Sequence, residues 1–172
     1  AIESVAQTWH GGAALGQKAT ATISRNGDLL TKLYLQVTLP ALGGSLAYVN
    51  KLGHRLIEEV ELEIGGHRID RTFGRYMDLW DELTQPSEMV EGEATLMGTD
   101  RSATVNYSNS MQTFTGAKTL FIPIHFWFTE TWGNALPLVA LQHHEVKISV
   151  TFAAPKDILL QCDDSLNTRN ES

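Results

Sequence analysis

Cysteine, basic residues and long apolar segments are all scarce in this sequence of 172 residues. Cys162 is the single cysteine, so no disulfide can form within the chain, and the fold must be stable without one. Lysine and arginine number 13 against 20 aspartates and glutamates, which gives a formal net charge of -7. Nucleic-acid binding normally uses a clustered basic surface, so we expect no direct contact with a genome.

No apolar run approaches the roughly 20 residues that a membrane-spanning helix requires. The longest such runs lie around Leu120 to Phe128 and Ala135 to Leu141. The opening residues, AIESVAQTWHGG, lack the basic start and the apolar stretch of a secretory signal. Because residue 1 is alanine rather than methionine, we expect a processed chain or a fragment.

Three segments show the strict alternation of apolar and polar side chains that is typical of a half-buried strand. The apolar side chains expected to face the core are Leu33, Leu35, Val37 and Leu39 in segment 32–39, Val60, Leu62 and Ile64 in segment 60–64, and Val146, Ile148, Val150 and Phe152 in segment 145–152. Glu61 and Glu63 are expected to face solvent.

Two turn signals lie beside these strands. Asn26-Gly27 separates the β-branched segment 18–24 from the strand at 32–39, and positive φ angles there predict a hairpin or a sharp bend. Gly65-Gly66 follows the strand at 60–64 and predicts a hairpin that returns through residues 67–70.

A further strand is expected from Thr119 to Phe128, where the sequence TLFIPIHFWF is apolar at almost every position. Such a run predicts burial on both faces, with Trp127 in the core. Pro123 has no amide hydrogen, so it requires an edge position or a bulge.

The hydrophobic period changes to that of a helix after residue 75. Tyr76, Leu79, Trp80 and Leu83 are spaced as one apolar helix face, and the acidic residues Asp78, Asp81 and Glu82 lie on the opposite side. This spacing predicts a short amphipathic helix that Pro86 ends. Segment 88–116, by contrast, has little periodicity and is expected to be a long connection.

Together these elements predict a mainly β fold, an antiparallel jelly-roll β-sandwich with a short inserted helix. We expect one such domain over residues 17–155, after an N-terminal arm at 1–16. Residues 156–172 are expected to be a C-terminal tail or a connection to a second jelly roll.

Catalytic chemistry finds little support in the sequence. The strongest candidate is a cupin-like metal site of His125, His143 and Glu145, but the spacing around His144 lacks the HxH pattern of such sites. His10, His54 and His67 are isolated and receive no role. No phosphate-binding glycine loop or nucleophile elbow is present, so we expect neither a cofactor nor enzymatic activity.

A few residues remain as candidates for surface function. Trp80 and Trp132 are candidate subunit-interface residues, because interfaces favour large aromatic side chains. Asn106 begins the N-glycosylation pattern Asn106-Tyr107-Ser108, although no secretory signal accompanies it. A carbohydrate-binding sandwich in which Trp132 or Tyr107 stacks on sugars is an alternative function.

Three stretches together resemble the major capsid proteins of nucleocytoplasmic large DNA viruses. They are ISRNGDLLTKLYLQVTLP at Ile23 to Pro40, GHRLIEEVELEIGGHRIDRTFGRYMDLWDELTQ at Gly53 to Gln85, and FIPIHFWFTETWGNALPLVALQHHEVKISVTF at Phe121 to Phe152. In that family the subunit is two jelly rolls in tandem, and the three stretches correspond to the first of them. This chain has the length for one jelly roll.

The resemblance implies a structural protein of an icosahedral shell, located in the virion and assembled in the infected host cell. Its implied partners are two further copies in a trimeric, pseudo-hexagonal capsomer, the neighbouring capsomers, and other capsid proteins such as minor capsid and penton proteins. An internal membrane beneath the shell is also implied, as is self-assembly through many contacts repeated by symmetry.

Overall fold

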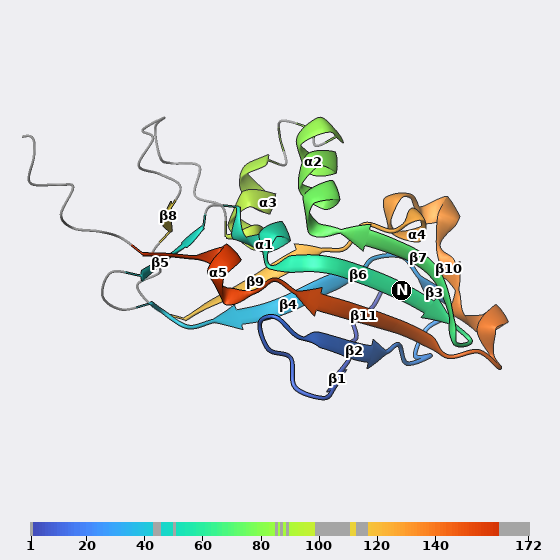
Figure 1. Ribbon diagram of the computed structural model, residues 1–172. Coiled ribbons are helices and arrows are strands. Elements are labelled where there is room, and N and C mark those ends of the chain that lie inside the picture. Colours follow the sequence, from blue (N-terminus) through green and yellow to red (C-terminus); the bar gives the residue numbers. More distant parts are fainter. Residues whose placement is uncertain are drawn as a thin grey trace, which may run out of the picture.

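Antiparallel strands in two facing layers form the framework of the computed structural model of the chain (Figure 1). The structure describes residues 2–42, 46–49, 51–84, 86, 88, 90–98, 111–112 and 117–161. The larger layer is a five-stranded sheet in the order β1-β2-β11-β6-β7. Its strands are β1 (Trp9–His10), β2 (Lys18–Thr22), β11 (Val146–Phe152), β6 (Ile57–Ile64) and β7 (His67–Phe73).

The second layer is centred on β4 (Tyr34–Leu39), which pairs with β9 (Lys118–Pro123) along its whole length. Two smaller groups of strands lie toward the ends of the molecule (Figure 1). One pairs β3 (Leu29–Leu30) with β10 (Leu136–Pro137), and the other has the order β12 (Leu159–Gln161), β5 (Leu46–Val49) and β8 (Met111–Gln112). The predicted mainly β, antiparallel fold is therefore confirmed.

Short helices connect the strands, and the longest of them stands on one side of the large sheet (Figure 1). They are α1 (Leu52–Arg55), α2 (Gly74–Thr84), α3 (Val90–Met97), α4 (Trp127–Glu130) and α5 (Pro155–Ile158), with 3-10 turns η1 (Trp132–Asn134) and η2 (Leu138–Leu141). Among the described residues, no helix has the length and apolar character to cross a bilayer.

The core lies between the two layers and follows the alternation of the sequence. Apolar side chains of β6 and β11 on one layer, and of β4 and β9 on the other, form one buried cluster. Its strand members include Val60, Leu62, Val146, Ile148, Val150, Phe152, Leu35, Leu39, Leu120 and Ile122. The three alternating strands of the sequence are thus confirmed, although Leu33, Val37 and Ile64 are only half-buried.

The two expected turns have different outcomes. Gly65 and Gly66 have φ angles of 61° and 82° and join β6 to β7 as the predicted hairpin. No positive φ occurs at Asn26 or Gly27, however, and the flanking strands lie in different layers, because β2 pairs with β11 and β4 with β9. The sharp bend is therefore correct and the hairpin is wrong: a turn signal does not determine whether the strands around it pair.

The strand expected at 119–128 is shorter than predicted. β9 ends at Pro123, which pairs with Tyr34 at the end of the ladder and so needs no amide hydrogen beyond it. The chain then enters α4, where the buried Thr129 hydroxyl accepts a hydrogen bond from the amide of Phe126 at 3.0 Å. Burial on both faces is wrong as well, since Phe121 and Trp127 are about two-fifths exposed. Trp127 is not a core residue.

Two further expectations need correction. Helix α3 and strand β8 lie within segment 88–116, which was expected to be a connection without regular structure. Glu61, expected to face solvent, is buried on the outer face of the large sheet between Lys18 and Arg68. The domain limits at 17 and 155 stay a prediction, although β1 pairs with β2, and Ile158 is fully buried beyond the expected limit.

Candidate functional site

Helix α2 is the element around which the unusual features of the surface gather. It begins at Gly74, where the chain passes close to β6 and α1. A Cβ at Gly74 would lie 2.1 Å from the carbonyl oxygen of Ile57 and 2.2 Å from that of His54. Only glycine permits this approach, so the start of α2 is held tightly against the sheet.

The orientation of α2 is the reverse of what its sequence suggests. Asp81 and Met77 are buried against the protein, and Asp78 is half-buried. Lys51, at the start of α1, forms ion pairs with Asp78 at 3.4 Å and with Glu82. The acidic side of the helix therefore faces α1, where Lys51 compensates its charge.

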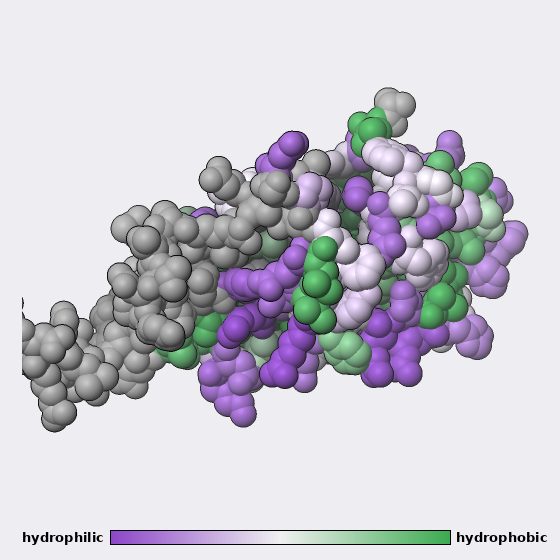
Figure 2. Space-filling model, turned by 90° about the horizontal axis from the view of Figure 1, so that it is seen from above, coloured by the Kyte–Doolittle hydropathy of each residue, from purple (hydrophilic) through white to green (hydrophobic). Residues whose placement is uncertain are grey.

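The apolar side of α2 consequently faces outward. Tyr76, Leu79 and Leu83 are at least half exposed, and Trp80 is half-buried with its ring stacked on Tyr76 at a centroid distance of 6.1 Å. We call these four residues the α2 apolar face. Figure 2 views the molecule from above, and on this face hydrophobic surface residues lie among hydrophilic ones.

The other tryptophan singled out from the sequence is also accessible. Trp132 lies in η1, directly after α4, and is 62% exposed. The assignment of Trp80 and Trp132 to a subunit interface stays a prediction, as does the sugar-stacking alternative for Trp132. Asn106, Tyr107 and Cys162 lie outside the described residues.

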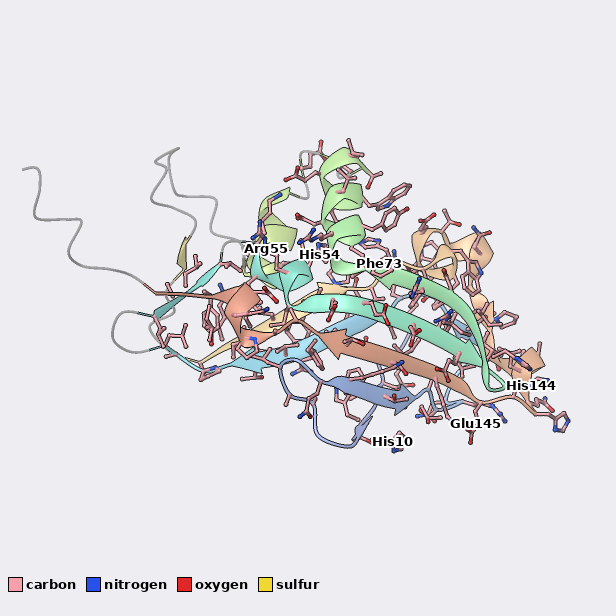
Figure 3. The ribbon with its side chains drawn as sticks, viewed as in Figure 1. His10, His54, Arg55, Phe73, His144 and Glu145 are labelled. Carbon is pink, nitrogen blue, oxygen red and sulfur yellow. The ribbon has the colours of Figure 1, made fainter. Side chains whose placement is uncertain are left out.

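The cupin-like set of His125, His143 and Glu145 is not assembled. Glu145 is exposed near the tip of the large sheet and pairs with Lys147 at 2.8 Å, and its pKa is lowered by that hydrogen bond. His144 and Glu145 lie far from His54 (Figure 3). His125, in turn, lies beside His54, with a ring centroid distance of 6.3 Å. The metal site hypothesised from the sequence is therefore wrong in its membership.

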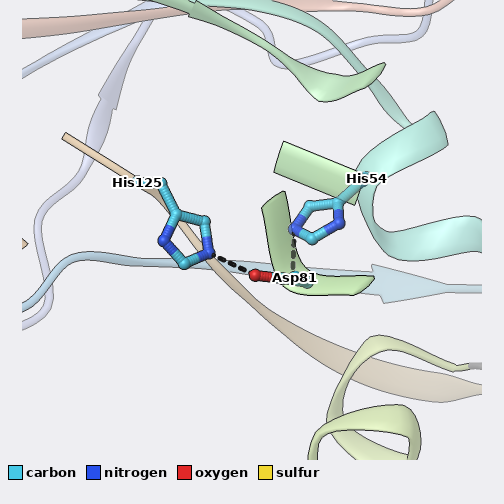
Figure 4. A group of neighbouring side chains, drawn as sticks. All are labelled: His54, Asp81 and His125. Carbon is cyan, nitrogen blue, oxygen red and sulfur yellow. Dashed lines mark ion pairs between the residues drawn. The ribbon is translucent and has the colours of Figure 1, made fainter. Parts of the chain in front are cut away.

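A different titratable group is present instead, made of His54, Asp81 and His125 (Figure 4). His54 comes from α1, Asp81 from α2, and His125 from the segment after β9. Asp81 Oδ1 lies 2.9 Å from His125 Nε2, and Asp81 Oδ2 lies 3.5 Å from His54 Nε2. The His54 side chain is 2% exposed, that of Asp81 10% and that of His125 21%.

The electrostatics of this group are dominated by burial. Loss of solvent lowers the pKa of His54, and the nearby His125 lowers it further, whereas Asp81 and Asp78 act in the opposite direction. His54 is therefore neutral at neutral pH. No sequence pattern indicates this group, because its members are far apart in the chain and form no motif. Whether a carboxylate such as Asp81 is buried depends on which side of its helix faces the protein, and this is known only from the structure.

Comparison with known proteins covers the entire chain. The family description "Major capsid protein N-terminus" matches residues 1–172. The major capsid protein of Pyramimonas orientalis virus is 42% identical over 168 residues, which is 97% of this chain and 41% of the relative. That of Phaeocystis pouchetii virus is 38% identical over 87% of this chain and 34% of the relative. The chain thus spans less than half the length of the curated relatives it matches.

Solved structures support the same relationship. The crystal structure of PBCV-1 VP54, fitted into a reconstruction of the virophage Sputnik, matches with a TM-score of 0.74 at 34% identity, over 90% of this chain and 35% of that one. The Faustovirus major capsid protein matches with a TM-score of 0.62, but at 14% identity it supports the fold alone. The likeness to PBCV-1 VP54 confirms the predicted jelly roll, and the family description confirms its N-terminal position.

Proposed function

The chain belongs to the major capsid protein family of nucleocytoplasmic large DNA viruses, and on this premise we propose that it forms the first jelly roll of a shell subunit. The complete subunit assembles into trimeric, pseudo-hexagonal capsomers, which pack against neighbouring capsomers in the virion. The proposed role is mechanical, with no chemical step and no cofactor.

The observation that carries this proposal is the α2 apolar face. Three large apolar side chains on one helix are at least half exposed, while the charged side of the same helix is turned inward. An isolated soluble domain gains stability from the opposite orientation, because apolar burial is favourable and surface charge is well solvated. A helix held in this orientation is therefore suited to burial against another protein surface.

The net charge of the chain argues against nucleic acid as one of the partners. A net charge of -7 disfavours contact with nucleic acid, so the shell does not bind the genome through this domain. Minor capsid and penton proteins, and a membrane beneath the shell, are proposed as further neighbours on the basis of the family alone.

The mass of the complete subunit tests the proposal. Expressed from the full reading frame, the protein is expected to sediment as a trimer or a larger array. Increasing dilution measures how tightly the copies bind, and a salt series separates apolar from ionic contacts. A mass equal to one chain at every protein and salt concentration would contradict the proposal.

A further inference from the structure

The group of His54, Asp81 and His125 has no part in the proposed shell contacts (Figure 4). We propose that it binds one divalent transition-metal ion, with zinc as the best match, and that the ion joins α1, α2 and the segment after β9. This proposal concerns one domain only. It can therefore fail while the assembly proposal holds, and the reverse is also true.

The donor atoms are of the right kind. Zinc in proteins takes imidazole nitrogen and carboxylate oxygen besides cysteine sulfur, and three protein ligands leave one coordination position for water. Calcium and magnesium, in contrast, prefer sites made of oxygen ligands alone. Two imidazoles and one carboxylate thus favour a transition metal over these two common ions.

The distances suit a single ion. In a tetrahedral zinc site with bonds of about 2.0–2.1 Å, neighbouring ligand atoms lie about 3.3 Å apart. The two close contacts here, both made by Asp81, are 2.9 Å and 3.5 Å, and one ligand atom from each residue lies within 4.8 Å of the others. The two distances made by Asp81 thus lie on either side of the spacing in a zinc site, although they involve its two different carboxylate oxygens.

The donor atoms also lack other partners. Within the described part of the chain, His54 Nε2, Asp81 Oδ2 and His125 Nε2 are buried and make no hydrogen bond. Buried polar atoms without partners are rare and unfavourable, and an unplaced ion is one of the usual reasons for them. His54, Asp81 and His125 thus bring ligand atoms within 4.8 Å of one another.

The second nitrogen of His54 supports this role. The backbone carbonyl of Pro123 lies close enough to His54 to act on the pKa of its imidazole. Nε2 makes no hydrogen bond, so Nδ1 is the nitrogen that can donate to this carbonyl. Metal-binding histidines characteristically donate their other N–H to a backbone carbonyl or carboxylate, which fixes the ring and leaves the free nitrogen to bind the ion.

The charges around the group favour a cation. Asp81 supplies the carboxylate of the cluster, and a carboxylate is a favourable ligand for a cation. Asp78 lies nearby on α2, where Lys51 pairs with it and with Glu82. A bound ion would compensate the Asp81 charge, and it would hold the acidic side of α2 inward, which is the orientation that exposes the α2 apolar face.

Metal titration of the purified complete protein tests this site. After removal of metal with a chelator, zinc added in a calorimeter is expected to bind at one equivalent per chain, and cobalt is expected to give the absorption spectrum of a site with nitrogen and oxygen ligands. A free zinc concentration of about one hundred times Kd should raise the melting temperature of the protein by about 5 °C or more. Magnesium should do neither.

Three variants assign the binding to this group. Asp81→Asn removes the charged donor at nearly unchanged volume, and His125→Gln removes a donor from the most exposed position of the three. Each should weaken zinc binding by at least about tenfold, because even changes in residues that only support metal ligands cost 10- to 100-fold. His143→Gln, which changes an exposed histidine outside the group, should bind zinc like the wild type.

Two results would overturn the proposal. One is the absence of stoichiometric zinc binding to the folded wild-type protein, which decides the matter even if a variant fails to fold. The other is zinc binding of unchanged affinity in Asp81→Asn or His125→Gln, with circular dichroism showing that the variant is folded.

Discussion

Glu61 is the residue at which burial and charge conflict most directly. It lies on the interior strand β6, is 6% exposed, and accepts hydrogen bonds from Lys18 and from Arg68, the latter at 2.9 Å. These hydrogen bonds, that of Lys18 first, hold the pKa of the Glu61 carboxyl below its usual 4.5, although burial acts to raise it. The carboxylate is therefore ionised and stabilising in the folded chain at neutral pH.

Replacement of Glu61 by glutamine should lower the free energy of unfolding at pH 7 by about 1 kcal/mol, a modest loss because Lys18 and Arg68 are half exposed. A lowered folded pKa means that the contribution is complete above pH 4.5 and is lost as the pH falls through the folded value. Urea unfolding across pH 3 to 7 should show the wild-type advantage shrinking in acid. The exposed Glu58→Gln on the same strand is the control, and equal losses in both variants would refute the assignment.

Adjacent aromatic residues in α4 test the revised position of Trp127. Phe128 is fully buried and stacks on Phe126 at a centroid distance of 5.6 Å, whereas Trp127 is 40% exposed. Phe128→Ala should lower the free energy of unfolding by about 3–5 kcal/mol, since it leaves a large cavity. Trp127→Ala should cost no more than about half of that, because less apolar area is lost from burial. Guanidinium unfolding measures both, and an equal or larger loss for Trp127→Ala would restore it to the core.

At the scale of elements, the strands with unbroken alternation were predictable and their partners were not. The alternation in β4, β6 and β11 reflects burial on one face, which the sequence records directly. Pairing between β2 and β11 depends instead on contacts more than 100 residues apart, which no local pattern records. The run after Pro123 resembles a strand in sequence because Ile124, Phe126 and Phe128 are buried. After one further hydrogen bond, from the Ile124 amide to the Leu33 carbonyl, the chain leaves the ladder and enters α4.

Helix α2 shows a second limit of sequence analysis. Its spacing predicted correctly that an amphipathic helix lies before Pro86, but the spacing cannot say which side faces the protein. Lys51, which lies on another element, forms ion pairs with the acidic side, and His54 and His125 lie beside Asp81 on that side. For the same reason the group of His54, Asp81 and His125 could not be predicted without knowing which side of α2 faces the protein.

The start of α2 should be intolerant of any side chain at Gly74. In Gly74→Ala the new methyl group meets two backbone carbonyl oxygens at distances that no rotation relieves, so the helix must move away from β6. We expect the free energy of unfolding to fall by at least about 3 kcal/mol, which is at the upper end of the effects of overpacking. Thermal unfolding measures it.

Gly92, within α3, supplies the matched control for this prediction. A Cβ there meets nothing within 4 Å, so Gly92→Ala should be neutral or stabilise the domain by up to about 1 kcal/mol through helix propensity. Destabilisation by both substitutions to the same extent would show that close approach at Gly74 is not the cause.

At the scale of the whole molecule, helix α2 exposes its apolar face and turns its charged face inward. This orientation is energetically favourable only if another protein surface covers the apolar face. We therefore expect the double substitution Leu79→Glu and Leu83→Glu to weaken assembly of the complete subunit while the domain stays folded. Both side chains are more than half exposed, so the change should alter the free energy of unfolding by less than about 1 kcal/mol. New carboxylates at a contact would instead be desolvated without partners, which is strongly unfavourable.

Sedimentation and melting temperature, measured on the same samples, separate these two effects. The double variant should sediment as a smaller species than the wild type at equal concentration, with a melting temperature close to that of wild-type protein diluted until it dissociates. Val139→Glu is the matched control, because Val139 is similarly exposed but lies in η2, away from α2. An unchanged mass in the double variant would mean that the α2 apolar face does not contribute to the contact between copies, and a reduced mass in Val139→Glu as well would mean that added charge alone explains the loss.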